Sequence, residues 1–370
     1  MAYFRKRGKK WYYTLEVRDA HGKRKKVERP GGLTKADCER AYRAAMAEID
    51  QTGEYSAPSN ITVEEFYSEW MRDYVEVNLK YNTIKTYSYL VNVHIIPAIG
   101  GMKLRRVTRH MLQNLLNEKK EGHARWTLVC ICNVIKKGFA YACYIAEYIK
   151  NNPAVAVRVP NYIEAPKEIA VFTPAQVATL FEKFPPGHRF YMAIALSYHT
   201  GMRLGECLAL KWEDVDLAGH SLFVRHTVIG EKDDPKFQEI PKTRSSIREI
   251  PFGKKLYKIL KGERARQAAH RLEYGEHYNN KGVVCCWPDG SMMIPQDFQQ
   301  FNYFCKHSFG AGSFHGLRHT HATMLLEAGE DLELVSKRLG HSNIGTTSKT
   351  YSHVLDKRKA KTVALLDEIL

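Results

Sequence analysis

Seven residues near the end of the chain, His315-Gly-Leu-Arg318-His-Thr-His321, decide how the sequence is interpreted. His315 and Arg318 are three positions apart, so on a helix their side chains project from one face, with Cβ atoms about 5–6 Å apart. One helix can therefore present an acid–base group and a fixed cation to the same phosphate. Taken alone the pattern is weak evidence, because such residues in an amphipathic helix are commonly structural.

Three further segments of the same region carry arginine, lysine, histidine and tyrosine side chains that could also act on a phosphate. They are Thr200-Gly-Met-Arg203-Leu-Gly-Glu206, Pro241-Lys242-Thr-Arg-Ser-Ser-Ile-Arg-Glu-Ile-Pro251, and Leu339-Gly-His341 with Tyr351 ten residues later. Breaking a phosphodiester places negative charge on the non-bridging oxygens of phosphorus, so fixed cations should surround that centre. Arg203 and Arg318 are the candidate clamps, because a guanidinium donates two parallel hydrogen bonds and stays protonated.

Together the four pieces resemble the catalytic domain of the tyrosine recombinases, the phage-integrase family, in order and in spacing over residues 173–357. The resemblance implies that Tyr351 attacks the scissile phosphate and forms a 3′-phosphotyrosine, without metal, ATP or any other cofactor. It also implies that Lys242 is the general acid, that His341 contacts the phosphate, and that Glu206 supports the site. A phenol with a pKa near ~10 is a weak nucleophile unless a base or nearby cations favour its phenolate form. His315 is our candidate proton acceptor.

Several residues compete for these roles. Tyr191, Tyr198 and Tyr303 lie in the same region as Tyr351 but lack its Gly-His predecessor and Ser-His-Val continuation, so we interpret them as packing residues. Lys236 competes with Lys242 but lacks the Thr-x-x-Ser-x-Arg continuation that follows Lys242. A metal site at the three histidines of 315–321 is the other alternative, although zinc normally takes three or four ligands and no Cys or carboxylate lies nearby.

The charge of the chain favours a polyanionic partner. Its 370 residues hold 56 Lys and Arg against 40 Asp and Glu, a net charge of +16, and half of that excess falls in residues 1–30 among interleaved aromatic residues. A charged strand edge that only discourages sheet pairing is the alternative interpretation. We expect these cations to contact DNA: Arg5, Arg7, Lys9, Lys10, Arg18, Lys23, Arg24, Lys25, Lys26, Lys80 and Lys85.

Breaks in composition divide the chain into three predicted domains, which gives a multidomain, mainly α fold with small β-sheets. Residues 1–53 combine a three-stranded sheet with a helix and are similar to the arm-type DNA-binding domain of integrases. Residues 61–150 are all helical, after a polar hinge, and resemble the family's core-type DNA-binding domain. Residues 168–370 form a mixed α+β catalytic domain, in which 221–229 and 247–251 are the expected strands and a basic, apolar tail follows Tyr351.

The composition also excludes several classes of protein. Forty-four per cent apolar and 26% charged residues are typical of globular proteins rather than disordered or fibrous ones. The sequence has no apolar run of about 18 residues and no apolar signal at its start, so we expect neither a membrane span nor secretion. Eight scattered cysteines form no disulfide framework. A cytoplasmic, nucleoid-associated location follows.

The sequence therefore predicts a site-specific DNA recombinase that integrates and excises a mobile element. Its expected partners are double-stranded DNA with arm-type and core-type sites, further copies of the chain in a homotetramer assembled through the C-terminal tail, an excisionase and a host DNA-bending protein. The tail could instead fold back on its own domain. The alternative functions are a type IB topoisomerase and a DNA-binding regulator that keeps the fold without cleavage.

Overall fold

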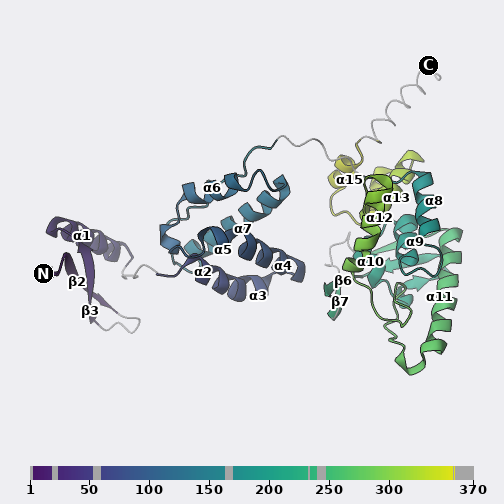
Figure 1. Ribbon diagram of the computed structural model, residues 1–370, viewed down its shortest axis with the longest axis horizontal. Coiled ribbons are helices and arrows are strands. Elements are labelled where there is room, and N and C mark those ends of the chain that lie inside the picture. The colour runs from purple at the N-terminus through teal and green to yellow at the C-terminus, as the bar shows by residue number, and fades with distance from the viewer. Residues whose placement is uncertain are drawn as a thin grey trace, which may run out of the picture. The chain divides into compact units, whose positions relative to one another are not determined.

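The structure is a computed structural model that describes residues 3–18, 24–52, 60–162, 170–231, 234–239, 247–352 and 354. Within those ranges, the side chains of residues 17–18, 24–25 and 48–52 are not described. The chain divides into two compact units, Met1–Tyr162 and Ile163–Leu370, and Figure 1 shows the elements of each.

The first unit begins with an antiparallel sheet of three strands in the order β1-β2-β3, followed by a helix. The sheet and helix bury Tyr13 and Leu15, which alternate with polar residues along the second strand, and Cys38 and Ala45, which lie on one stripe of the helix. The ring of Tyr42 also contacts the rings of Phe4 and Tyr13 at its edge. The elements are β1 (Tyr3–Arg7), β2 (Lys10–Arg18), β3 (Arg24–Gly32) and α1 (Lys35–Thr52).

The remainder of the first unit is helical and has a separate core. Phe66, Tyr67, Trp70 and Phe139 are completely buried there. Thr62 begins the first helix through the predicted capping box, with its hydroxyl accepting from the Glu65 N–H and the Glu65 carboxylate accepting in return.

Two of the helices in this part contain five-residue π-helical segments. The helical elements are α2 (Val63–Trp70), π segment η1 (Met71–Val75), α3 (Glu76–Asn78), α4 (Tyr81–Leu90), π segment η2 (Val91–Ile95), α5 (Ile96–Ile99), 3₁₀ turn η3 (Leu104–Arg106), α6 (Arg109–Glu118) and α7 (Arg125–Tyr144).

The last helix of this part is shorter than the sequence predicts. The helical pattern of the sequence over 124–150 predicts one long helix, but α7 ends at Tyr144. The chain reverses at Glu147, which has a φ of 53°, and this reversal brings Ile149 into the helical core. The hydroxyl of Tyr148 then donates to Glu69, so burial and a hydrogen bond together outweigh continuation of the helix.

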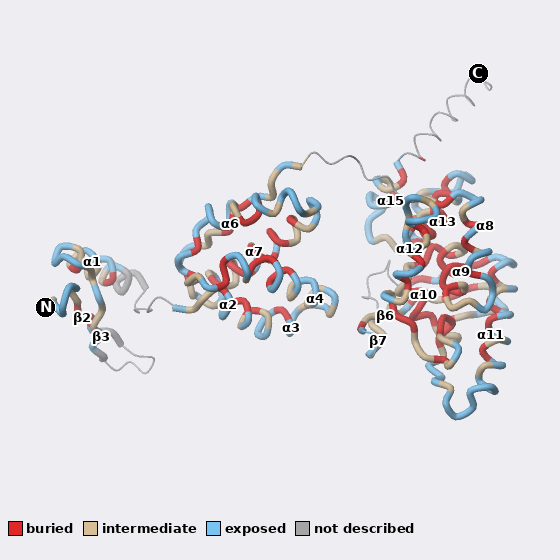
Figure 2. Tube along the Cα trace, viewed as in Figure 1, coloured by how far each residue is buried: buried red, intermediate tan, exposed pale blue. Residues whose placement is uncertain are grey.

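The second unit surrounds one deeply buried helix, α9 (Figure 2). Residues 192–197 are buried on every side, as expected for a helix that is apolar all round. Thr173 and Pro174 begin the preceding helix with the predicted N-cap and first-turn proline. The helical elements are α8 (Pro174–Lys183), α9 (Tyr191–Thr200), α10 (Leu204–Ala209), α11 (Lys254–Tyr274), α12 (Gln299–Phe309), α13 (Phe314–Glu327), α14 (Leu332–Leu339) and α15 (Ile344–Thr350), with 3₁₀ turns η4 (Trp212–Asp214), η5 (Gly275–His277) and η6 (Pro295–Phe298).

The strands of the second unit form two small antiparallel sheets. One has the order β4-β5-β8 and the other is the pair β6-β7. We expected one strand over 221–229, but the chain leaves the first sheet at Arg225, whose guanidinium pairs with the buried Asp214 at 3.1 Å. The strands are β4 (Val215–Asp216), β5 (Ser221–Val224), β6 (His226–Glu231), β7 (Asp234–Glu239) and β8 (Arg248–Pro251).

Candidate active site

The site begins where α9 ends, at a glycine that no other residue can replace without strain. Gly201 adopts a left-handed φ of 74°, and a Cβ added there would lie 2.7 Å from Leu339 and 2.9 Å from His321. The missing side chain lets the end of α9 lie directly against α13 and α14. This close approach joins three of the four pieces that the sequence analysis singled out.

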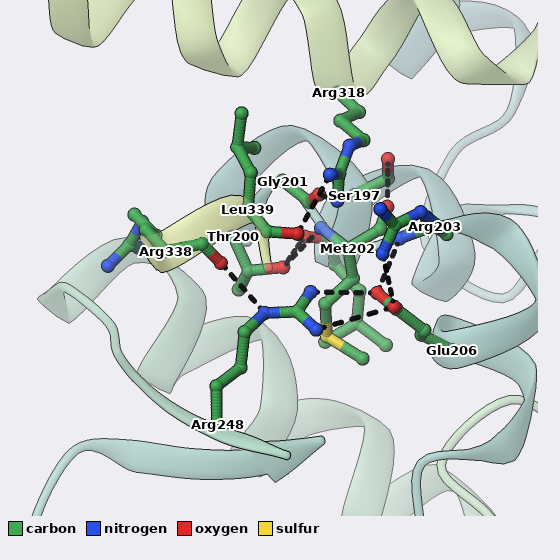
Figure 3. A network of polar contacts seen from close by, with 11 residues as sticks. Ser197, Thr200, Gly201, Met202, Arg203, Glu206, Arg248, Arg318, Arg338 and Leu339 are labelled. Atoms are coloured by element: carbon green, nitrogen blue, oxygen red, sulfur yellow. Dashed lines mark hydrogen bonds and ion pairs between the residues drawn. The ribbon is translucent and has the colours of Figure 1, made fainter. Parts of the chain in front are cut away.

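Arg203 and Glu206 lie one turn apart at the start of α10, with Arg248 of β8 on the other side of the carboxylate (Figure 3). Glu206 is buried and accepts from Arg248 at 2.8 and 3.3 Å and from Arg203 Nη1 at 2.9 Å. Arg248 also donates through Nε to the Arg338 carbonyl oxygen at 2.8 Å. One buried carboxylate therefore fixes the guanidinium of Arg203, and Arg248 ties both to the end of α14.

Burial and the two arginines act on Glu206 in opposite directions. Burial would raise the pKa of its carboxyl group, but Arg248 and Arg203 outweigh burial and hold that pKa at about 2. Glu206 is therefore ionised at neutral pH.

Arg318 lies on α13 and is almost completely buried. Its two terminal nitrogens donate to the carbonyl oxygens of Gly201 and Leu339, both at 2.7 Å, as Figure 3 shows. Burial, then repulsion from Arg203, lowers the pKa of Arg318 to about 9, so it stays charged at neutral pH. Main-chain dipoles, rather than a carboxylate partner, hold this guanidinium in position.

Tyr351 follows α15 and has no exposed surface. Its hydroxyl lies 2.8 Å from Nδ1 of His319, the residue after Arg318 on α13. Burial raises the pKa of the phenol to about 12, and the charge of Arg318 opposes that rise. The phenol is therefore neutral in this structure and is bonded to an imidazole.

His315 and His341 complete the surroundings of the phenol. His315 is exposed, and its ring centroid lies 4.7 Å from that of His319. His341 follows Gly340, which ends α14 with a φ of 70° as the sequence predicts, and its Nδ1 lies 2.7 Å from the Thr347 hydroxyl. Partial burial, then Arg318 and Arg203, lowers the pKa of both histidines, that of His341 to about 4.

The remaining predicted residues lie at the surface or outside the described part of the chain. Lys242 and Lys23 lie outside the described residues, as does the tail after Tyr351 apart from Ser352 and Val354. Arg18, Arg24 and Lys25 have described backbone only, in β2 and β3. Exposed cations are Arg5, Arg7, Lys9, Lys10, Lys26, Lys80 and Lys85, of which Arg7 pairs with Glu28 and Lys26 with Glu16.

The competing residues have other contacts. Tyr198 donates to the sulfur of Met324, Tyr191 packs against the main core, and Tyr303 stacks on His307. Lys236 pairs with Asp234 at 2.6 Å on β7. Within the described residues, no three His, Cys, Asp or Glu side chains gather as a metal site.

Three residues that matter for this geometry were not predicted as site residues. Arg248 stood in the quoted Thr-x-x-Ser-x-Arg pattern, and that pattern was the signal for it. His319 was interpreted as a residue that packs or hydrogen-bonds within the helix junction, and only its position beside Arg318 could have suggested a role at the phenol. Thr347 carries no sequence signal, because its partner His341 is fixed only by the fold.

The second unit brings together two arginines, three histidines and a phenol. This set of side chains is typical of an active site that acts on phosphodiesters. The model of the phage integrase family matches residues 170–358, and that of the integrase N-terminal SAM-like domain matches residues 62–120. The chain belongs to the phage integrase family. It is a tyrosine recombinase of the integrase type.

Relatives and solved structures agree with this assignment. A tyrosine recombinase XerC-like protein of Caldanaerobacter subterraneus subsp. tengcongensis is 30% identical over 98% of this chain and 97% of its own length. The ICEBs1 integrase of Bacillus subtilis is 27% identical over 80% of each chain. The Tn1549 transposon integrase, solved with a circular intermediate DNA, shares the fold with a TM-score of 0.65 at 21% identity, over 82% of this chain and 99% of that one.

These similarities favour one of the three functions that the sequence left open. The family and its relatives support site-specific recombination, and they do not favour a topoisomerase or a regulator without activity. The predicted fold class is confirmed. Among the described residues, no helix has the length and apolar character that a bilayer crossing requires.

Proposed function

We propose that this recombinase cuts and rejoins DNA through a covalent 3′-phosphotyrosine on Tyr351. The observation that carries the proposal is the position of the phenol, which bonds a residue of α13 next to the buried Arg318. A buried phenol with a raised pKa is unreactive until a phosphate and a base are in place. Because the phosphotyrosine keeps the energy of the broken bond, rejoining needs neither ATP nor metal.

The surrounding residues take the roles that the phosphodiester requires. Arg203 and Arg318 bind the non-bridging oxygens, and His315 and His341 donate further hydrogen bonds to them. Glu206 holds Arg203 in place through the 2.9 Å contact between them. Lys242 protonates the leaving 5′ oxygen as general acid.

The wider assembly follows from charge and from the three-domain division at 1–53, 61–150 and 168–370. The basic sheet binds arm-type DNA sites, the helical domain binds core-type sites with Lys80 and Lys85, and binding weakens steeply with salt as counterions are released. Four chains assemble on DNA through their C-terminal tails, with an excisionase and a host DNA-bending protein as further partners. The protein works in the bacterial cytoplasm at the nucleoid.

A nicked suicide duplex tests the nucleophile. The duplex carries a candidate crossover sequence, with a nick near the crossover so that the cleaved strand is lost. Wild type becomes trapped as a covalent adduct in the presence of a metal chelator, whereas Tyr351→Phe binds the duplex normally and yields no adduct. Tyr303→Phe, at an exposed tyrosine of the same unit, is the matched control and keeps wild-type trapping. An adduct that survives Tyr351→Phe contradicts the proposal.

A further inference from the structure

The hydroxyl of Tyr351 has an imidazole, rather than solvent, as its neighbour. His319 Nδ1 lies 2.8 Å from the phenol oxygen, and the two rings meet at an angle of 61° with their centroids 5.8 Å apart. This distance is typical of a direct hydrogen bond between oxygen and nitrogen. His319 is therefore within reach of the proton that a nucleophilic phenol must lose.

The groups around His319 keep it able to accept a proton. His315 and Arg318 face it from α13, His341 from the loop before α15, and Tyr351 from the end of α15. Burial, and then His315, Arg318 and His341, lower the pKa of His319 to about 4, so its ring is neutral at physiological pH. A neutral ring with its proton on Nε2 presents the lone pair of Nδ1 to the phenol.

His315 is placed for a different task. It is the exposed member of the pair, and its ring stands at 82° to that of His319. An exposed imidazole beside two arginines is suited to meet an incoming phosphate. The half-buried imidazole beside the phenol is suited to take its proton.

We propose that His319 is the general base that removes the proton of Tyr351 during strand cleavage. This inference rests on the proposed function, because it needs Tyr351 as the nucleophile. It assigns to His319 the proton transfer for which the sequence suggested His315.

The step balances in protons and in electron pairs. As the Tyr351 oxygen forms its bond to phosphorus, the O–H pair stays with that oxygen and the proton moves to His319 Nδ1. The bond from phosphorus to the 5′ oxygen breaks, and that oxygen takes a proton from Lys242. Rejoining reverses both proton transfers, so His319 returns its proton to the departing phenol. Cleavage followed by rejoining therefore consumes no protons.

A bound phosphate makes this transfer easier than it is in the empty site. The phosphate brings a negative charge among Arg203, Arg318 and the histidines, and this charge favours the imidazolium form of His319. The phenol also becomes more acidic as its oxygen bonds to phosphorus. General-base catalysis of this kind contributes about 100- to 10,000-fold to rates.

The test compares two variants on two suicide duplexes, one ordinary and one with sulfur in place of the bridging 5′ oxygen. Sulfur leaves without a proton, so this duplex bypasses the general acid but not the base. His319→Asn keeps an acceptor near the place of Nδ1 but takes up no proton at neutral pH, and it should cleave both duplexes about 100-fold more slowly than wild type. Lys242→Ala should recover on the sulfur duplex, and His319→Asn should not.

Two further measurements separate proton transfer from a structural role. The rate of His319→Asn should rise about tenfold per pH unit between about pH 6 and pH 8, whereas the wild-type rate changes little. In His319→Gly, added imidazole should restore cleavage. His307→Asn, at an exposed histidine of α12 in the same unit, is the matched control and should behave as wild type.

The outcomes distinguish this inference from the proposed function. If wild type is trapped and His319→Asn is trapped at a similar rate with the same pH profile, His319 is not the base, although Tyr351 remains the nucleophile. Recovery of His319→Asn on the sulfur duplex would also overturn the inference. If wild type forms no adduct on either duplex, the proposed function fails as well.

Discussion

The two sides of the candidate active site are held in place by different means. On the arginine side, formed by Arg203, Glu206, Arg248 and Arg318, three of the four charged groups are buried and have two or more partners, and the partly exposed guanidinium of Arg203 pairs with Glu206. On the tyrosine side, formed by His319, His341, Thr347 and Tyr351, two single hydrogen bonds hold the polar groups. The tyrosine side also depends on α15, a helix of only seven residues.

Under the proposed function, the arginine side binds phosphate and the tyrosine side attacks it. Hydrogen bonds and ion pairs already hold the arginine side without a ligand, as electrostatic stabilisation of a transition state requires. In that proposal, the tyrosine side breaks only one or two hydrogen bonds for the nucleophile to approach phosphorus. The predictions below measure how far the two sides differ.

The largest expected effect is the removal of Arg248. Arg248→Met leaves the buried Glu206 with Arg203 as its remaining guanidinium partner, and loss of one member of a buried ion pair costs about 3–5 kcal/mol. The free energy of unfolding in urea measures this. Lys337→Met is the matched control, because it breaks an exposed pair with Glu333 and should leave the free energy of unfolding close to that of wild type. Equal losses would show that the arginine side is no more firmly held than the surface.

The second prediction separates the two sides by pH. Each lowered pKa stabilises the fold above the ordinary pKa of the group, and that stability is lost as the pH falls toward the folded value. For His319 and His341 this stability is lost between pH 6.5 and about pH 4, which we call the upper window. For Glu206 it is lost between pH 4.5 and about pH 2, which we call the lower window. Stability should therefore begin to fall below pH 6.5 and should fall further below pH 4.5.

One variant on each side of the site tests which residue causes the loss of stability in each pH window. His341→Gln should remove about 1–3 kcal/mol of the change in the upper window, and Glu206→Gln should flatten the lower window. Urea unfolding over a pH series measures both. If His341→Gln alters only the lower window, the histidine is not neutral in the folded protein.

The smallest expected effect concerns the hydroxyl that orients His341. Thr347 is completely buried, and Thr347→Val keeps its shape but removes the 2.7 Å contact with Nδ1. Loss of such a hydrogen bond should cost about 1 kcal/mol of stability and lower cleavage several-fold. Thr347→Ser keeps the hydroxyl and should keep wild-type cleavage. A valine variant with unchanged cleavage would show that His341 needs no orientation.

The sequence could predict those features that depend on local patterns. The strand alternation around Tyr13 and Leu15, the helix starts at Thr62 and Thr173, and the glycine before His341 all depend on neighbours a few residues away. These features follow from the geometry of strands, caps and left-handed turns. The helix starts at Thr62 and Thr173 and the helix end at Gly340 lie where these local patterns predict them.

Other features depend on contacts between segments that are distant in the sequence. These features could not be predicted from the sequence. The early end of α7 results from Ile149 entering a core built from other helices. The partner of Tyr351 is 32 residues away and shares no pattern with it. Arg248 meets Glu206 across 42 residues, and only the fold brings β8 to α10.

The way Arg318 is held has a consequence for the empty enzyme. Two carbonyl oxygens accept hydrogen bonds from its terminal nitrogens without neutralising its charge, and Arg203 adds a second positive charge nearby. Arg203, Arg248 and Arg318 therefore have one carboxylate, that of Glu206, among three positive charges. A small oxyanion that binds there will offset the excess positive charge and stabilise the folded state. Sulfate or phosphate in the buffer will therefore raise the melting temperature. The concentration of these anions must be the same whenever variants are compared.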